Sequence, residues 1–274
     1  MTLNDYYQWP DLDTLQPVMF LGHGSPMNAI EVNDFTREIS MRGKLLTAPK
    51  AILCISAHWE TRGTQVTANT TQPTIHDFRG FPKALFDFQY PAPGDPTLSL
   101  LTATQLAPEP VEQSLHWGLD HGSWSVLTHL FPKADVPVVQ LSLDFLKTPA
   151  EHLELAKKLK PLRRKGVLIL GSGNMVHNLT LVDWSRLHEG SFGFDWAIEV
   201  DEKLKLLMAK QDVKSLVQCI NSSTSFQLAI PTPEHYLPMI YAMACVDASE
   251  QIDFFNDRPW GGSITMTSFI TKSK

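Results

Sequence analysis

Four short apolar runs constrain the fold of this 274-residue chain more than any other sequence feature. The runs cover residues 18–21, 51–56, 136–143 and 166–170. They are continuous rather than alternating with polar residues, which is typical of strands that are covered on both faces. We therefore expect these runs to lie in a parallel sheet flanked by helices.

Stretches with helical periodicity separate or follow these runs. Residues 150–162 carry leucines at spacings of two, four and three, with acidic residues first and lysines last, as the helix dipole favours. Further helices are expected over 194–210 and 236–247, and a late strand over 265–270. This alternation predicts an α/β fold, a single domain in which helices flank a mostly parallel central sheet.

Composition and charge exclude several classes of protein. Hydrophobic residues make up 43% of the chain and charged residues 19%, which suits a packed core rather than disorder. The formal net charge is -6, and the chain lacks the basic block with which nucleic-acid binders contact phosphate. The densest basic run, 157–165, alternates with leucines and indicates a solvated helix face. The three cysteines are far apart, which argues against a disulfide scaffold and a thiolate zinc site.

The sequence also lacks the signals of membrane proteins and of several enzyme classes. The first 15 residues hold neither the basic nor the apolar segment of a signal peptide, and no apolar stretch reaches the roughly 18 residues of a membrane span. The nucleophile elbow, the Walker loop and the HExxH zinc motif are absent as well. We expect a soluble cytoplasmic protein with neither membrane nor nucleic-acid partners.

Three histidines follow three of the predicted strands. His23 comes just after the first run, His58 after the second and His177 after the fourth. Because ligands of open α/β sheets bind beyond the carboxyl ends of the strands, we expect these imidazoles to face one crevice. His235 lies in a proline-rich loop before a predicted helix, beside Glu234, an alternative carboxylate ligand. Converging imidazoles without a thiol suit iron, zinc, copper or nickel, so the pattern predicts a metal centre.

Two further histidines have neighbours that suit a binding site. His121 stands between Asp120, which is expected to orient its imidazole, and Gly122, which permits close approach to a ligand. A structural turn fits this segment equally well. His76 belongs to an aromatic loop, 73–82, which carries charges of both signs and is either a pocket wall or a surface loop. Structural or surface roles are expected for His129, His152 and His188.

Seven motifs, in order along residues 18–270, carry a resemblance to a known family. They are GHGSPM (22–27), SAHW (56–59), PTIHDF with GFP (73–82), YPAPG (90–94), DHGSW (120–124), SGNMVHN (172–178) and TPEHYLP (232–238). The chain resembles the 4,5-DOPA extradiol dioxygenase family, which belongs to the class III extradiol ring-cleaving dioxygenases and is related to the catalytic subunit of protocatechuate 4,5-dioxygenase. Residues 1–16 fall outside the resemblance, which implies an N-terminal extension followed by one domain over 17–274.

The resemblance implies a metal-dependent active site at the strand ends. Members of the family use non-haem Fe(II), and some bacterial members hold Zn(II). By motif, the metal ligands match His23, His58 and His235. His177 matches a histidine that is either a further ligand or an acid/base, and His121 matches one that contacts substrate or oxygen. Within and beside these motifs, the residues expected next to the substrate are Ser25, His76, Asp77, Arg79 and Trp124.

The resemblance implies cleavage of a catechol such as L-DOPA, with both atoms of O2 inserted to give a muconic semialdehyde of the seco-DOPA type. An all-histidine site leaves the double charge of the metal unbalanced, so a catechol that loses both protons is favoured over a monophenol. Arg79 and Ser125 stand where glycine is usual in the family, and Arg79 is expected to pair with a substrate carboxylate. The alternatives are a zinc-dependent hydrolase and a non-catalytic binding protein on the same fold. The chain is expected to act as a monomer or small homo-oligomer.

Overall fold

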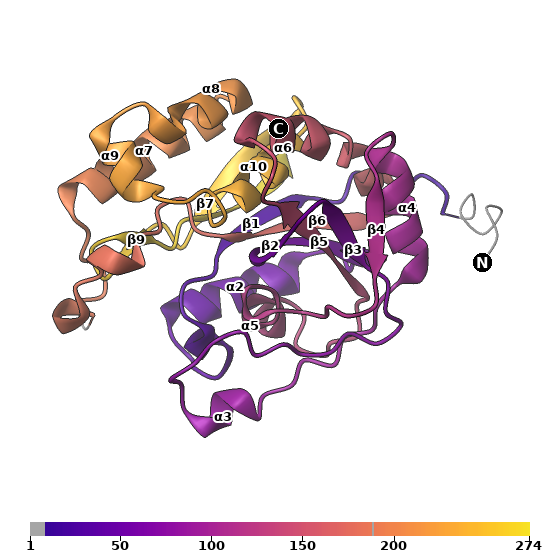
Figure 1. Cartoon of the computed structure of the whole chain (residues 1–274), viewed down its shortest axis with the longest axis horizontal. Coiled ribbons are helices and arrows are strands. Elements are labelled where there is room, and N and C mark those ends of the chain that lie inside the picture. The colour runs from indigo at the N-terminus through magenta and orange to yellow at the C-terminus, as the bar shows by residue number, and fades with distance from the viewer. Residues whose placement is uncertain (1–8, 188) are drawn as a thin grey trace.

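A large central sheet dominates the computed structural model, which describes residues 9–187 and 189–274 (Figure 1). The strands are β1 (Val18–Gly22), β2 (Ala51–Thr61), β3 (Thr64–Thr67), β4 (Val111–Ser114), β5 (Val138–Asp144), β6 (Val167–Gly173), β7 (Glu250–Phe255), β8 (Pro259–Trp260), β9 (Ile264–Thr265) and β10 (Ser268–Ser273). Eight of them form one sheet in the order β4-β3-β5-β2-β6-β1-β10-β7, while β8 and β9 form a separate pair.

Helices cover both faces of this sheet. The α-helices are α2 (Asp34–Leu45), α3 (Lys83–Phe86), α4 (Pro96–Leu106), α5 (His121–Leu130), α6 (Pro149–Lys157), α7 (Asp195–Ala209), α8 (Val213–Gln218), α9 (Thr224–Ala229) and α10 (Leu237–Ala244). The 3-10 helices are η1 (Pro26–Ala29), η2 (Lys160–Lys165), η3 (Leu179–Leu181), η4 (Trp184–Arg186) and η5 (Cys219–Asn221). Figure 1 shows α2 and α5 on one side of the sheet and α6 and α10 on the other.

The predicted parallel core is confirmed. β1 and β2 both pair in parallel with β6, and β2 also pairs in parallel with β5. Successive residues of β1 alternate between two hydrophobic cores, since Val18 and Phe20 belong to one and Met19 and Leu21 to the other. Both faces of these strands are therefore buried, which is why their sequences are continuously apolar. The chain is a single α/β domain with a mostly parallel sheet.

Several predicted elements end elsewhere than expected. The helix predicted over 150–162 ends at Lys157, because Pro161 has no amide hydrogen with which to continue an α-helix, and η2 follows instead. The late strand predicted over 265–270 is two strands: β9 pairs with β8, whereas β10 pairs antiparallel with β1 and β7. The antiparallel strands β10 and β7 thus extend one side of the parallel core.

The basic run 157–165 is not wholly a solvated face, as the sequence suggested. The side chain of Arg163 is fully buried. Its guanidinium donates hydrogen bonds to both carboxylate oxygens of Glu250 and to the carbonyl oxygens of Gln16 and Cys245. A buried arginine is tolerated here because its charge is paired and its donors are used. This contact ties η2 to β7 and to the chain just before β1.

The described residues near the N-terminus also contact η2. The amide of Leu12 donates to the carbonyl of Arg164, and that of Gln16 donates to Arg163. The predicted boundary between an extension and the domain at residues 16 and 17 stays a prediction. Across the described ranges, no helix is both long enough and apolar enough to span a membrane.

Candidate metal centre

Two strands on either side of β6 bring His23 and His58 together. β1 ends at Gly22, directly before His23, and its neighbour β6 separates it from β2, which carries His58. The expectation that the second strand ends before His58 was wrong, since β2 continues to Thr61. Its register with β5 shifts between Ile55 and Glu60, so His58 lies in an irregular stretch of the strand rather than in a loop. Such bulges commonly redirect a side chain beside an active site.

His23, His58 and His235 form a compact group of possible metal ligands. One ring nitrogen from each lies within 4.8 Å of the others. The Nε2 atoms of His23 and His58 are 3.0 Å apart, and the ring centre of His235 lies 5.4 Å from that of His23 and 5.0 Å from that of His58. A tetrahedral ion with bonds of 2.0–2.1 Å places its ligand nitrogens about 3.3 Å apart. The spacing of the His23 and His58 nitrogens is close to that value.

The hydrogen bonds of His23 determine which nitrogen is free. Ser172 donates its hydroxyl hydrogen to the carbonyl oxygen of Gly122, with 2.5 Å between the oxygens. Its oxygen must therefore accept the hydrogen from Nδ1 of His23, which lies 3.0 Å away. This fixes the neutral tautomer of His23 with a lone pair on Nε2. That lone pair points at Nε2 of His58.

Acidic neighbours favour the same tautomer for His235 and His58. Nδ1 of His235 donates to Glu234, 3.2 Å away, and Nδ1 of His58 lies 3.6 Å from the carboxylate of Asp77. Each carboxylate favours the hydrogen on Nδ1 and leaves the lone pair on Nε2. Lone pairs that face each other at 3.0 Å repel unless a proton or a cation lies between them. This donor set therefore fits a metal ion.

Burial keeps these imidazoles neutral, as metal ligands must be. It lowers the pKa of His23 and of His58 well below the ordinary value, and neighbouring histidines lower both further. Burial also lowers the pKa of His235, although the hydrogen bond to Glu234 opposes that shift. Burial alone would raise the pKa of Glu234, but the hydrogen bond from His235, a backbone hydrogen bond, the nearby charge of His235 and the hydrogen bond from Thr232 together outweigh it and lower that pKa to about 2.

His121 begins α5 and is held by an acidic residue from a distant segment. Asp77 accepts hydrogen bonds from the backbone amide and from Nδ1 of His121, both at 2.9 Å. Burial alone would raise the pKa of Asp77, but these bonds outweigh it and lower the pKa. The ring centre of His121 lies 3.8 Å from that of His58, and the two histidines with Asp77 form a second possible ligand group.

Asp120 does not orient His121, contrary to the expectation from its adjacent position. Asp120 is fully buried and caps α5 through the amide of Ser123. Its carboxylate also accepts hydrogen bonds from Ser56 and Gln140. Burial, together with the charge of Asp77, raises the pKa of Asp120. Asp120 therefore anchors the start of the helix that carries His121.

Gly122 brings α5 close to β2. A Cβ atom at this position would lie 2.5 Å from the hydroxyl of Ser56 and 2.8 Å from the ring of His58. Only glycine permits this approach. The sequence predicted a close approach at Gly122, and the residue approached is His58, a candidate metal ligand.

His177, Glu234 and His235 form one further possible ligand group. The rings of His177 and His235 stack, with centres 3.5 Å apart and planes 7° apart. Burial and the neighbouring His235 lower the pKa of His177 to about 3. His177 is therefore neutral at neutral pH.

These histidines line one cavity of about 440 Å³. Its volume is within the usual range for small-molecule sites. The complete set of lining residues comprises five histidines, four aromatic residues and small or aliphatic residues: His23, Gly24, Ser25, Pro26, His58, Phe78, Phe81, His121, His177, Leu179, Trp184, Leu187, His235, Trp260 and Ile264. The structure thus brings Ser25 and all five predicted metal-site or catalytic histidines to the same cavity.

Four residues that were predicted to lie beside the substrate are placed outside that lining. Trp124 is fully buried, and its indole nitrogen donates to the carbonyl of Ile75. His76 pairs with the carbonyl of Phe88. Asp77 reaches the site through His121, and Arg79 is exposed. The residues of loop 73–82 that line the cavity are Phe78 and Phe81.

Sequence reasoning missed the orienting role of Ser172 and the cavity walls Trp184 and Trp260. Ser172 belongs to a matched motif, so its position was visible but its hydrogen bond was not. The two tryptophans come from segments 76 residues apart, and their rings meet edge to face with centres 6.2 Å apart. The sequence did hold a signal for these cavity walls, because each tryptophan is a large aromatic residue among polar neighbours.

Comparisons with known proteins agree with this geometry. A family model described as the catalytic LigB subunit of aromatic ring-opening dioxygenase matches residues 16–259. The chain is 45% identical over 258 residues to the 4,5-DOPA dioxygenase extradiol of Escherichia coli K12, covering 93% of this chain and 94% of that protein. It is 34% identical over 258 residues to the protein of the same name from Beta vulgaris, covering 92% and 94%.

A solved structure is similar along nearly the whole chain. It is the crystal structure of an uncharacterized protein from Escherichia coli K12, which matches with a TM-score of 0.80 and 41% identity, over 93% of this chain and 99% of that one. The family model alone covers well over half of the sequence. As its motifs predicted, the chain belongs to the LigB family of aromatic ring-opening dioxygenases and is an extradiol dioxygenase.

Proposed function

We propose that this enzyme opens the ring of a catechol with a polar side chain, such as L-DOPA, at the carbon–carbon bond next to the diol. Both atoms of O2 enter the product, a muconic semialdehyde of the seco-DOPA type, so the reaction needs no external reductant. The observation that carries the proposal is the convergence of His23, His58 and His235 in one aromatic-walled cavity. Relatives named 4,5-DOPA dioxygenase extradiol support the choice of substrate.

We assign Fe(II) as the metal for this activity, held by His23, His58 and His235, while Zn(II) is the ion we expect to compete for the same nitrogens. Bound Fe(II) would supply the Lewis acidity and the one-electron chemistry that ring opening by O2 requires. The ligands add no negative charge, because burial keeps their imidazoles neutral. A doubly deprotonated catechol balances the charge of the ion, so the site selects catechols over monophenols.

His121 and Asp77 are suited to move a proton beside the ring. The carboxylate of Asp77 holds the hydrogen of His121 on Nδ1 and leaves Nε2 with a lone pair. The same carboxylate stabilises the ring once Nε2 takes up a proton from the catechol. The protonated Nε2 can then donate a hydrogen bond to oxygen as negative charge develops there.

His177 is the second group that can receive a catechol proton. Its low pKa keeps it unprotonated at neutral pH, and an anionic substrate in the cavity would raise that pKa. We propose that His177 acts as acid/base, or as a further ligand through its position against His235. The walls Phe78, Trp184 and Trp260 would stack on a flat ring and exclude water.

The test is anaerobic loading with Fe(II), followed by exposure to a panel of catechols in air. We expect a yellow product, consumption of one O2 per catechol, and retention of both atoms from ¹⁸O2 in the product. Zinc-loaded protein should not consume O2. Oxygen-independent hydrolysis of amides or esters by the zinc form, with no ring cleavage by the iron form, would contradict the proposal.

Predictions of the domain boundary, the cellular location and the oligomeric state accompany this proposal. We expect the catalytic domain to span residues 17–274 and the protein to act in the cytoplasm as a monomer or small homo-oligomer. A protein that begins at residue 17 should retain the metal stoichiometry of the full chain. Light scattering of the full chain gives the oligomeric state.

A further inference from the structure

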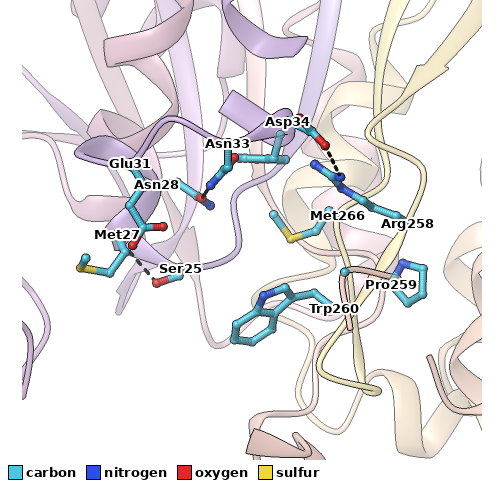
Figure 2. Close-up of a pocket in the computed structure, with 12 residues that line it drawn as sticks. Ser25, Met27, Asn28, Glu31, Asn33, Asp34, Arg258, Pro259, Trp260 and Met266 are labelled. Atoms are coloured by element: carbon cyan, nitrogen blue, oxygen red, sulfur yellow. Dashed lines mark hydrogen bonds and ion pairs between the residues drawn. The ribbon is translucent and has the colours of Figure 1, made fainter. Parts of the chain in front are cut away.

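Figure 2 shows the residues that line a second cavity, of about 360 Å³. Ser25 and Trp260 line both cavities. The walls of the second cavity also carry charged side chains from separate segments, namely Glu31 after η1, Asp34 at the start of α2 and Arg258 between β7 and β8. A substituent on a ring in the first cavity would therefore meet charged groups on passing Trp260.

Arg258 has unused hydrogen-bond donors. Its closest acidic partner among the described residues is Asp34, with 3.9 Å between Nη1 and Oδ2. That separation is too long for a hydrogen bond. Asp34 is 78% exposed and lies closer, at 2.9 Å, to Arg37. Arg258 thus pairs with Asp34 only at long range, and its hydrogen-bond donors stay available to an anion in the cavity.

The backbone around Arg258 is well anchored. Its amide donates to the carbonyl of Asn256, and its carbonyl accepts from the amide of Met266, both at 2.8 Å. The side chain of Asn256 donates in turn to the carbonyl of Phe35 in α2. These bonds hold the segment between β7 and β8 against α2, so Arg258 is presented from a fixed backbone.

Glu31 supplies the opposite charge. Its side chain is exposed at the cavity and has no ion-pair partner within residues 9–187 and 189–274. Figure 2 shows Arg258 and Glu31 on opposite sides of the view, with Met266 and Trp260 between them. Because Arg37 offsets the charge of Asp34, the cavity presents one available cation and one available anion.

We propose that this second cavity binds the charged end of the substrate side chain, with Arg258 holding its carboxylate. The ligand class is a catechol with a carboxylated side chain. The assignment rests on the proposed ring-cleaving function and adds the residue that selects the substrate. A planar guanidinium suits a carboxylate because it can donate two parallel hydrogen bonds.

Arg258 and Arg79 are the two arginines that compete for this role. Arg79 is exposed in the loop that contributes Phe78 and Phe81, and it lines neither cavity. Arg258 lines a cavity that shares two walls with the metal centre. The geometry therefore favours Arg258 as the residue that binds the substrate carboxylate.

Four ligands test the carboxylate contact: 4-methylcatechol and dopamine lack a carboxylate, whereas 3-(3,4-dihydroxyphenyl)propionate and L-DOPA carry one. Each is tested for cleavage by the Fe(II) enzyme in air and for binding to the Zn(II) form by calorimetry. For Arg258→Met, the kcat/KM for the two carboxylated ligands, divided by that for 4-methylcatechol, should fall roughly ten- to a hundredfold. The control Arg62→Met, at an exposed arginine that lines neither cavity, should leave every ratio within about twofold.

An unchanged ratio for the carboxylated ligands in Arg258→Met would overturn the assignment, and so would an equal loss for all four ligands. If the wild-type enzyme cleaves no catechol, the proposed function is wrong. The ratios of dissociation constants measured with the zinc form then test the role of the second cavity by themselves. If Arg258→Met does not fold, Arg258→Lys replaces it. Lysine keeps the charge but loses the planar fork, so the carboxylated ratio should fall by a smaller factor, and no fall would again overturn the assignment.

Discussion

Replacing Ser172 with alanine removes the oxygen that orients His23 in the metal centre. Both side chains are buried, so water cannot replace the lost hydrogen-bond partner without rearrangement. His23 then either leaves its Nδ1 hydrogen unpaired or moves that hydrogen to Nε2, where it blocks the lone pair that binds metal. Loss of such an orienting partner lowers metal affinity by about ten- to a hundredfold, or about 1.4–2.7 kcal/mol.

Competition with a chromophoric chelator measures this effect without catalysis. We expect Zn(II), and Fe(II) under anaerobic conditions, to bind Ser172→Ala that much more weakly than wild type. Ser125→Ala is the matched control, because the Ser125 hydroxyl is also buried but has no hydrogen-bond partner in the described part of the chain. Its affinity should stay within about twofold of wild type. An equally small change for Ser172→Ala would refute the orienting role of Ser172.

Three other substitutions test separate parts of the structure. Asp77→Asn leaves one acceptor for the two donors of His121, so kcat for a catechol, expressed per bound metal ion from elemental analysis, should fall about ten- to a hundredfold; an unchanged kcat per metal ion would contradict this. His58→Ala should lower the metal content of purified protein below one ion per chain, and full occupancy would remove His58 from the ligand set. Arg163→Met leaves Glu250 buried without its partner and should lower the free energy of unfolding by about 3–5 kcal/mol in urea; Glu250→Gln in the same chain should restore part of that loss.

The strands were predictable because burial on both faces imposes a simple pattern. Residues such as Met19 and Phe20 pack against opposite layers, so polar residues are excluded from both. The short strands β3 and β4, at one end of the sheet, are largely polar, and their sequences give no such pattern. The continuation of β2 through His58 depends on a register shift against β5, which is a property of two strands together.

The candidate ligands were predictable to the extent that chain position determines spatial position. His23 follows a central strand directly, so its location at the sheet edge follows from the topology. The partner of His121 was not predictable in this way. Proximity in sequence pointed to Asp120, but that carboxylate caps α5. The hydrogen bond from Nδ1 of His121 is accepted instead by Asp77, which is 44 residues away in the sequence. Hydrogen-bond partners of this kind depend on how loops fold over the helix ends.

His152 links the stability of the fold to pH at a site away from the metal centre. It lies on α6 and is 1% exposed. Nδ1 is 2.9 Å from the hydroxyl of Tyr241, and Nε2 is 3.2 Å from the carbonyl of Asp144. The carbonyl can only accept, so Nε2 carries the hydrogen and Nδ1 accepts from the tyrosine. The neutral ring thus satisfies both contacts, and a second proton would break the one with Tyr241.

Burial lowers the pKa of His152 from 6.5 to about 4 in the folded protein, against the opposing effect of its hydrogen bond to Asp144. On acidification the unfolded chain therefore takes up this proton first, so the stability that His152 contributes is complete above pH 6.5 and is lost as the pH falls towards 4. Between pH 7 and pH 5 the linkage amounts to about 2 kcal/mol. His152→Gln keeps a donor and an acceptor but cannot titrate. Urea unfolding across this range should show the wild type losing about 2 kcal/mol more than the variant, because every other titrating group is common to both. Parallel stability curves for the two proteins would show that His152 does not resist protonation in the fold.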